Sequence, residues 1–225
     1  LVDISISPDH LFVYAASKGR EYIKDGHRNH FPIEHCKQKK LTELNKLLTD
    51  LVKRPEYQKF TLIGSGLQYK FGQTTIARQD VNQSVPGNES EDFLQHIQSL
   101  VKSIDPQNDF FRIEDTGKDI EIILTLEDAQ GKTKDFDKGD GVSFLNKDIN
   151  LQIESGSNLI CGDTPSDVPM VKFINAHSDN NSVIFVTEDD DLKKQVKTYS
   201  KNPIFVSTPD VLVTILNKMA LQNIQ

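Results

Sequence analysis

The period of hydrophobic and polar positions changes several times along the 225-residue chain, and these changes predict the order of its helices and strands. The continuous apolar run 11–16 is typical of a parallel strand covered on both faces. The segment 22–31 contains Asp25 and Gly26, a two-residue hairpin signal. Leucines then recur at helical spacing over 41–52. The first third is therefore predicted to form a strand, a hairpin and a helix.

The middle third has the pattern of short strands grouped around one helix. Strands are predicted at 60–63 and 74–77, around a glycine-rich bend, and a second pair at 110–113 and 120–124. A helix with one apolar face is predicted over 93–104. Clustered strands with a crossing helix indicate an antiparallel α+β module.

The last third alternates between strands and helices. Strands are predicted at 159–161, 183–186 and 204–206. The helices are predicted around 144–145 and over 168–174, 192–199 and 211–219. Such alternation requires right-handed crossovers and favours a parallel, doubly wound α/β sheet.

The middle module therefore reads as an insertion into an α/β core. We expect core segments at 1–57 and 131–225 and an α+β insert at 58–130. An insertion of this kind is often a lid over the carboxyl ends of the strands, where such sheets bind ligands.

Composition and charge narrow the class of protein. Hydrophobic residues make up 36% and charged residues 26%, which is ordinary for a soluble globular protein. No apolar stretch approaches the roughly 20 residues that span a membrane. The net charge of −7 argues against a nucleic-acid partner. Two cysteines are too few for a disulfide framework, so a cytoplasmic protein is expected.

The segment Gly162–Asp167 follows a buried apolar run and carries two carboxylates four residues apart. Asp163 would lie at the carboxyl edge of the sheet and Asp167 at the start of the next helix. Mg²⁺ takes oxygen ligands and commonly uses one or two carboxylates together with phosphate and water. The alternative is a capped helix with Ser166 or Asp167 at the N-cap, which leaves Asp163 unexplained.

Two other segments offer candidate chemistry. Asp137–Gly141 places Lys138 just before a helix predicted to begin near Val142, where anchoring a phosphate or a carboxylate nucleophile would offset its unfavourable position at the helix dipole. A polar turn explains the same residues. The run Asp189–Asp191 after a strand could display a nucleophile and its acid–base partner, or simply begin an acidic helix.

The insert contains polar side chains suited to sugar recognition, although alternate strand positions also simply face water. These residues are Gln68, Lys70, Arg78, Arg112, Glu114 and Glu121.

The motifs Lys138–Gly141 and Gly162–Met170, in this order, together resemble the haloacid dehalogenase superfamily of phosphatases. The longer agreement resembles trehalose-6-phosphate phosphatases of the invertebrate, nematode-like type. It includes segments 17–21, 62–68 and 206–211, and it covers nearly the whole chain.

The resemblance implies a Rossmann-like core with a mobile cap, a requirement for Mg²⁺ and hydrolysis of trehalose 6-phosphate. By position, Lys138 would steady the nucleophile and the substrate phosphate. Asp163 would bind Mg²⁺ directly, and Asp167 would bind it or orient its waters. An aspartyl-phosphate would form, while a second carboxylate protonates the leaving sugar and then activates water. The cap residues implied to contact the sugar are Lys70, Gln68, Glu114 and Glu121.

One part of the family's pattern is missing from the chain, namely the nucleophile motif on the first core strand. We expect the sequence to be a fragment of a longer chain, which could include a trehalose-phosphate synthase part, because a sheet without its central strand would expose a hydrophobic slot. The alternative is a non-catalytic phosphatase-like domain that regulates an attached synthase. A third hypothesis is a related phosphatase with a different sugar substrate.

Overall fold

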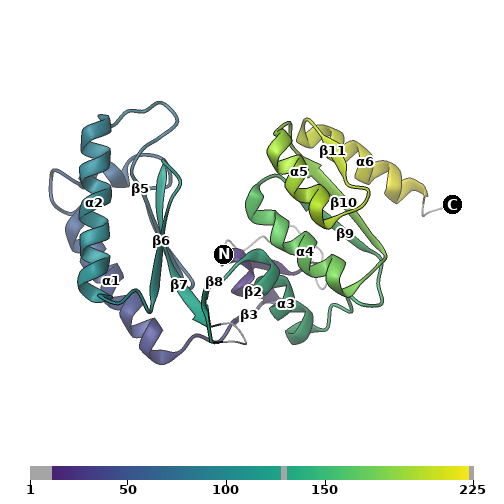
Figure 1. The fold of residues 1–225 in the computed structure, drawn as a ribbon, viewed down its shortest axis with the longest axis horizontal. Coiled ribbons are helices and arrows are strands. Elements are labelled where there is room, and N and C mark those ends of the chain that lie inside the picture. Colours follow the sequence, from purple (N-terminus) through teal and green to yellow (C-terminus); the bar gives the residue numbers. More distant parts are fainter. Residues whose placement is uncertain (1–11, 128–130, 223–225) are drawn as a thin grey trace. The chain divides into compact units, whose positions relative to one another are not determined.

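The computed structural model describes residues 12–127 and 131–222. The chain divides into two compact units, Leu1–Phe136 and Asp137–Gln225, here called the N-terminal and the C-terminal unit (Figure 1). Each unit has its own hydrophobic core. This division differs from the predicted boundaries at 57/58 and 130/131, and the assignment of segments to a phosphatase core and cap stays a prediction.

A small antiparallel sheet of β1 (Tyr14–Ala16), β2 (Glu21–Lys24) and β3 (His27–His30) begins the N-terminal unit. The predicted hairpin is confirmed, since its two turn residues Asp25 and Gly26 have φ values of 52° and 76°, as a tight turn between twisted strands requires.

The expectation of a buried parallel strand over 11–16 is wrong. β1 pairs antiparallel with β2, and Phe12 and Val13 are exposed, while Leu11 lies outside the described residues. A short apolar run does not by itself tell which of its faces will be covered.

A larger antiparallel sheet forms the rest of the N-terminal unit, with strand order β4-β5-β7-β6 and β8 paired to β7. Its strands are β4 (Leu67–Lys70), β5 (Gln73–Ala77), β6 (Phe111–Asp115), β7 (Asp119–Glu127) and β8 (Thr133–Asp135). The predicted α+β character of this region is confirmed, and α1 (His35–Val52) and α2 (Gly87–Ile104) supply its helices.

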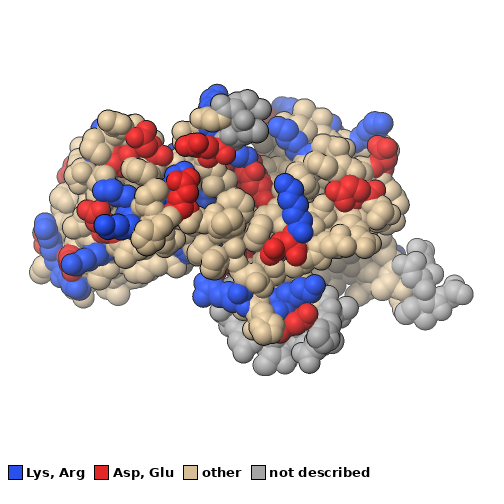
Figure 2. Space-filling view, turned by 90° about the horizontal axis from the view of Figure 1, so that it is seen from below, with Lys and Arg blue, Asp and Glu red and all other residues tan. Residues whose placement is uncertain are grey.

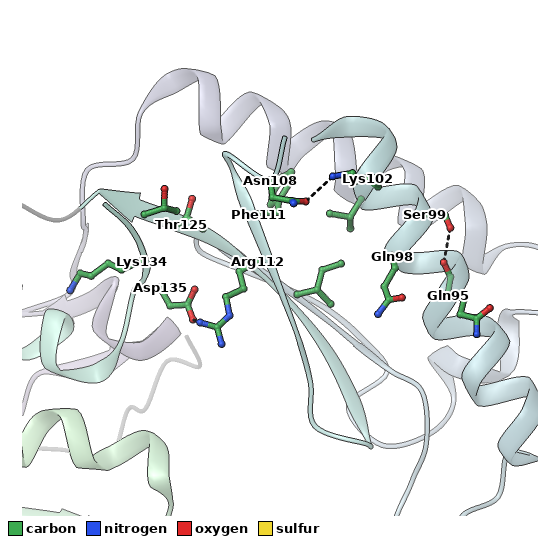
Figure 3. A pocket seen from close by; sticks show the side chains of 13 residues that line it. Gln95, Gln98, Ser99, Lys102, Asn108, Phe111, Arg112, Thr125, Lys134 and Asp135 are labelled. Atoms are coloured by element: carbon green, nitrogen blue, oxygen red, sulfur yellow. Dashed lines mark hydrogen bonds and ion pairs between the residues drawn. The ribbon is translucent and has the colours of Figure 1, made fainter. Parts of the chain in front are cut away.

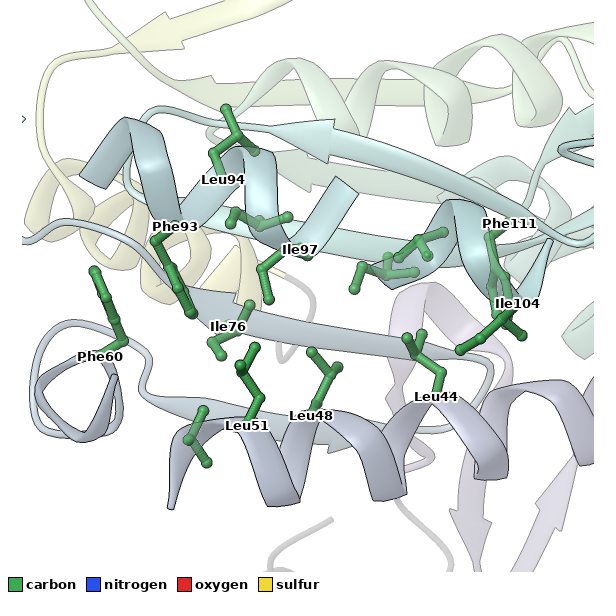
Figure 4. Packing of buried hydrophobic residues seen from close by; sticks show 14 of the residues in the cluster. Leu44, Leu48, Leu51, Phe60, Ile76, Phe93, Leu94, Ile97, Ile104 and Phe111 are labelled. Carbon is green, nitrogen blue, oxygen red and sulfur yellow. The ribbon is translucent and has the colours of Figure 1, made fainter. Parts of the chain in front are cut away.

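The core of this unit lies between the two helices and one face of the sheet (Figure 4). Leu44 and Leu48 of α1 and Ile97 of α2 are fully buried beside Ile76 of β5. Because α1 buries its leucines here, it belongs to the same compact unit as the segment predicted to be an insert.

The predicted strand at 60–63 is wrong, because this segment contains the short 3₁₀ helix η2 (Gln58–Thr61). Phe60 is buried and stacks on Phe93 with ring centroids 3.8 Å apart. Phe60, which suggested a strand, therefore packs against α2 from a 3₁₀ turn.

The side chain of Arg20 ties the small sheet to the larger one. Its guanidinium donates hydrogen bonds to the carbonyl oxygens of Gly72 (2.7 Å) and Leu124 (2.6 Å) and lies 4.6 Å from the ring centroid of Phe136. A Cβ at position 72 would fall 2.0 Å from Arg20 Nη1, so only glycine leaves room for this contact.

The C-terminal unit confirms the predicted alternation of strands and helices. Its three strands are parallel in the order β11-β10-β9, with β9 (Asn158–Gly162), β10 (Asn181–Val186) and β11 (Ile204–Val206). The helices are α3 (Lys138–Ile149), α4 (Val168–His177), α5 (Asp190–Tyr199) and α6 (Pro209–Gln222), with the 3₁₀ turn η3 (Pro165–Asp167) before α4. The unit is therefore an α/β fold with a parallel sheet, and the carboxyl ends of its three strands lie at the same edge of that sheet.

On the face seen in Figure 2, acidic and basic side chains are intermixed. Across the described ranges, every helix is too short or too polar to cross a bilayer.

Candidate functional site

The loop after β9 is closed tightly onto the end of that strand. Gly162 ends the strand, and a Cβ there would lie 2.7 Å from both the Cβ of Asp167 and the ring of Phe185. Glycine at this position therefore lets the segment 163–167 fold back against the sheet edge, as the predicted position of the two aspartates requires.

Asp167 is the centre of this loop. It is only 4% exposed, and its Oδ2 accepts hydrogen bonds from the backbone N–H groups of Asp163 and Thr164, each at 3.0 Å, and from Thr164 Oγ1 at 3.1 Å. Its Oδ1 accepts a hydrogen bond from Lys138 Nζ. Burial raises the pKa of Asp167, but the hydrogen bonds from Lys138, Asp163 and Thr164 outweigh it and hold this pKa below its ordinary value.

Lys138 reaches Asp167 because α3 begins earlier than predicted. The helix begins at Lys138 rather than near Val142, and Asp137 caps it through a capping box with Asp140. A Cβ on Gly139 would lie 2.7 Å from the carbonyl oxygen of Pro169, so glycine allows the first turn of α3 to approach α4 closely. The structure thus brings Lys138 and Asp167 together.

The Asp163 carboxylate is exposed, and no described residue donates a hydrogen bond to it or forms an ion pair with it. Asp163 and Asp167 are therefore not equivalent, since one carboxylate is free and the other is engaged by four donors.

These residues fit a cation that takes few protein ligands. In the described part of the chain, no group of three or more His, Cys, Asp or Glu side chains is arranged to enclose a metal. Mg²⁺ does not need such a cage, because it usually keeps several waters and binds one or two carboxylates plus phosphate oxygens. Asp163 offers one free oxygen ligand, and Asp167 lies behind it in the same loop.

Thr164 was missed by the sequence analysis, although its signal was present. Thr164 and Asp167 form a capping box at η3, in which the threonine is the N-cap and the aspartate is the N3 residue. Asp167, one of the two predicted N-cap residues, is the N-cap of α4, although its side chain makes no capping hydrogen bond to that helix and instead closes the turn before it. The Thr-x-x-Asp spacing is the sequence mark of this arrangement.

The acidic run 189–191 has the arrangement of a helix start. The Asp189 side chain accepts hydrogen bonds from Asp191 N (2.8 Å) and Leu192 N (3.3 Å) and so caps α5. Asp190 pairs with Lys193. The capping interpretation accounts for this run without a catalytic role.

A second group of candidate residues lies on one face of the β4-β5-β7-β6 sheet. The strand register places Gln68 opposite Thr75, Thr75 opposite Glu121, and Glu121 opposite Glu114. Lys70 is two residues along β4 from Gln68 and so shares its face. The four residues predicted to contact a sugar therefore lie on one face of one sheet, which we call the polar face.

Contacts within the N-terminal unit hold several of these side chains. Gln68 Nε2 donates to Ser65 O at 2.9 Å, and Lys70 Nζ donates to Thr75 Oγ1 at 3.0 Å. Lys18 Nζ lies 3.8 Å from Glu121 Oε2. Sequence reasoning did not select Lys18, whose left-handed φ of 61° in the turn after β1 carries no sequence signal.

The other two polar residues of this region form ion pairs. Arg78 pairs with Asp115 and Glu91, and Arg112 pairs with Asp135.

Comparison with known proteins gives the family. A sequence model described as "Trehalose-6-phosphate phosphatase, C-terminal" matches residues 1–212. The chain is 33% identical over 222 residues to a protein of Aphelenchoides avenae named alpha,alpha-trehalose-phosphate synthase (UDP-forming) 1, covering 95% of this chain and 19% of that protein. It is 28% identical over 227 residues to a trehalose-phosphatase of Brugia malayi, covering 97% and 45%.

Among solved structures, the chain is similar to a "trehalose-6-phosphate phosphatase related protein", with a TM-score of 0.56 at 14% identity over 92% of this chain and 71% of that one. This likeness concerns the fold. The chain spans about a fifth of the synthase-named relative and less than half of the phosphatase. Since the family's sequence model matches nearly the whole chain, the chain belongs to the trehalose-6-phosphate phosphatase C-terminal family.

Proposed function

We propose that this chain supplies the metal-binding and sugar-recognising parts of a Mg²⁺-dependent trehalose-6-phosphate phosphatase. In this proposal the parallel strands of the C-terminal unit are the last part of a haloacid dehalogenase-like core, and the antiparallel sheet of the N-terminal unit is its cap. The observation that carries the proposal is the loop 163–167, which leaves Asp163 free while Lys138 holds Asp167.

In the C-terminal unit, Asp163 would hold Mg²⁺, and Asp167 would orient its waters or bind it. When bound, the cation would neutralise charge on the phosphoryl group being transferred. Lys138 sits in the first turn of α3, where its ammonium can contact both the Asp167 carboxylate and a phosphate oxygen. The attacking aspartate would be supplied by the longer chain that the phosphatase relatives suggest.

In the N-terminal unit, the polar face would bind the sugar. Glu114 and Glu121 face each other across neighbouring strands, an arrangement of like charges that nearby donors relieve. The Lys18 ammonium is one such donor, 3.8 Å from Glu121 Oε2. Sugar hydroxyls are such donors, and Lys70 and Gln68 add donors from β4. A carbohydrate would thus find both acceptors and donors on one sheet face.

The test of this function is phosphate release by the natural protein that contains the chain. We expect release from trehalose 6-phosphate that depends on Mg²⁺ and is much slower from glucose 6-phosphate. Equal rates with both sugars would support the related-phosphatase hypothesis instead. Tight binding of trehalose 6-phosphate in calorimetry without any release would contradict the enzyme.

A second candidate function has an observation of its own. Two relatives that are 33% and 32% identical to this chain are named synthases, and the chain covers 19% of the length of each. A phosphatase-like domain that binds trehalose 6-phosphate without hydrolysing it, and so regulates an attached synthase, is therefore the alternative. In that case the natural protein would bind the sugar phosphate and its synthase rate would respond to it, with no phosphate released.

We predict that Glu121→Gln raises the KM for trehalose 6-phosphate about tenfold and leaves kcat within about twofold, because a neutral amide accepts hydroxyl hydrogen bonds more weakly. The measurement is steady-state phosphate release. Glu56→Gln, an exposed position in the turn after α1, is the matched control and should leave both constants unchanged. A fall in kcat at unchanged KM would show that Glu121 does not bind the ground-state sugar.

A further inference from the structure

A groove in the N-terminal unit runs between α2 and the edge of the larger sheet, on residues to which the proposed function gives no role. It has a volume of about 910 Å³. Figure 3 shows the side chains of α2, among them Gln95, Gln98 and Lys102, along one side, and those of β6 and β8 along the other.

The strand that borders this groove is an unpaired sheet edge. β6 is the last strand in the order β4-β5-β7-β6 and has no second neighbour among the described strands. Thr125 N donates to Phe110 O at 3.0 Å, so the pair 110/125 is a hydrogen-bonded one. Because antiparallel bonds alternate, the backbone groups of Phe111, Ile113 and Asp115 point away from β7.

A contact of Phe111 supports this assignment. Its N–H donates to Asp105 Oδ2 at 2.9 Å, on the side opposite β7. The N–H and C=O of Ile113 therefore face the groove as a template for another strand.

The walls of the groove have the composition that an added strand needs. Val101, Phe111 and Ile113 give an apolar floor on the helix side of the edge. Successive side chains of an added strand would point alternately to this floor and to the opposite side, where Arg112 lies.

The charged side chains of the groove indicate which kind of peptide strand would bind there. Of the side chains that line the groove, Lys102, Arg112 and Lys134 are cationic and Asp135 is the one carboxylate, which pairs with Arg112. Lys134 also has an interaction of its own, so the preference for charge rests on Lys102. This positive balance contrasts with the net charge of −7 of the whole chain. An occupant with negative charge is therefore favoured here.

We propose that this groove binds an extended acidic peptide segment of a partner protein, which adds as a strand to β6 and lies against α2. Backbone hydrogen bonds to the edge would supply affinity, and the apolar floor and basic rim would supply selectivity.

The test uses the full 225-residue chain and a fluorescein-labelled probe, the capped hexapeptide Glu-Val-Glu-Val-Glu-Val. We expect saturable binding in fluorescence anisotropy with a Kd on the order of 100 μM. The corresponding lysine–valine peptide should bind about tenfold more weakly or not at all, because its charges oppose the rim. A glutamate–valine peptide N-methylated at every residue should also fail, because it has no N–H to donate.

Two variants locate the binding. Lys102→Glu should weaken the acidic probe about tenfold, whereas Lys118→Glu, an exposed lysine of the same unit, should not change its Kd. Ile113→Pro removes a donor that faces the groove and not β7, so it should abolish binding. Circular dichroism establishes that this variant is folded, and Lys102→Glu decides the question if it is not.

Several results would overturn the proposal. These are no saturation below about 1 mM, equal binding of the acidic and basic peptides, or unchanged affinity in Lys102→Glu. A concentration-dependent dimer that Ile113→Pro abolishes would show that a second copy of the chain covers the edge, and it would likewise exclude the peptide.

Discussion

Replacing Asp163 with asparagine is expected to slow Mg²⁺-dependent phosphate release from trehalose 6-phosphate at least about 100-fold in the natural protein that contains this chain. Asp163 is the exposed carboxylate at the end of β9, and the described residues leave it free to bind a cation. Asparagine keeps the size of the side chain but removes its charge, so the affinity for Mg²⁺ falls while the fold is kept.

This expectation has a readout besides turnover. Calorimetric titration of the 225-residue chain with Mg²⁺ should show weaker binding for Asp163→Asn than for the unchanged chain. Asp179→Asn, another exposed aspartate of the C-terminal unit, serves as the matched control. Because the Asp163 side chain supports no described contact, the melting temperature should stay within about 2 °C. Undiminished turnover would remove Asp163 from the metal site.

The sequence predicts secondary-structure elements best where a hydrophobic periodicity extends over several helical turns or where the residues of a tight turn are specific. α1 and α2 were found from leucine and isoleucine spacing, and the β2–β3 hairpin from Asp25-Gly26. The predictions for the short runs 11–16 and 60–63 are wrong, because an apolar run of this length fits an edge strand, a buried strand or a 3₁₀ turn equally well. Only tertiary packing, such as Phe60 on Phe93, decides among them.

For the site, the sequence predicted which residues lie there but not that their environments differ. Asp163 and Asp167 looked like a pair of equal ligands, yet Asp167 is buried under Lys138 and Thr164. That difference depends on where α3 begins and on how closely Gly139 lets it approach α4. Spacing along the chain carries no information about that distance.

The residues of the polar face were predictable from the sequence, but the strand register that brings them onto one face was not. Gln68, Glu114 and Glu121 come from three strands, and their common face follows from pairings among β4, β5, β7 and β6. A shift of one residue in any pairing would move a side chain to the opposite face. Lys18 lies beside Glu121 because its backbone has a left-handed conformation, which no local sequence pattern predicts.

The second large effect is expected at Asp167. Asp167→Asn should lower the free energy of unfolding of the chain by about 3 kcal/mol. The amide has one acceptor oxygen in place of two, so it cannot serve Lys138 and the N–H groups of Asp163 and Thr164 together. Its NH₂ group would also face the Lys138 ammonium. Urea denaturation at pH 7 measures the loss, and Asp179→Asn should show none.

The pH dependence distinguishes this role from simple packing. The folded-state pKa of Asp167 lies below its ordinary value of 3.8, so the unfolded chain binds more protons near that pH. Its contribution to stability is therefore fully present above the unfolded pKa and is lost as the pH falls through the folded one. The difference in unfolding free energy between the unchanged chain and Asp167→Asn should shrink as the pH falls below about 4.

Lys138→Met separates the ion pair from the loop hydrogen bonds. Without the ammonium, burial acts against the Asp167 charge, so the pKa of Asp167 rises and the chain loses stability at neutral pH. The double variant Lys138→Met with Asp167→Asn leaves no unpaired buried charge and should lose less than the two single losses added together. Additive losses would show that the two side chains do not act on each other, and Lys138 would then be free for phosphate alone.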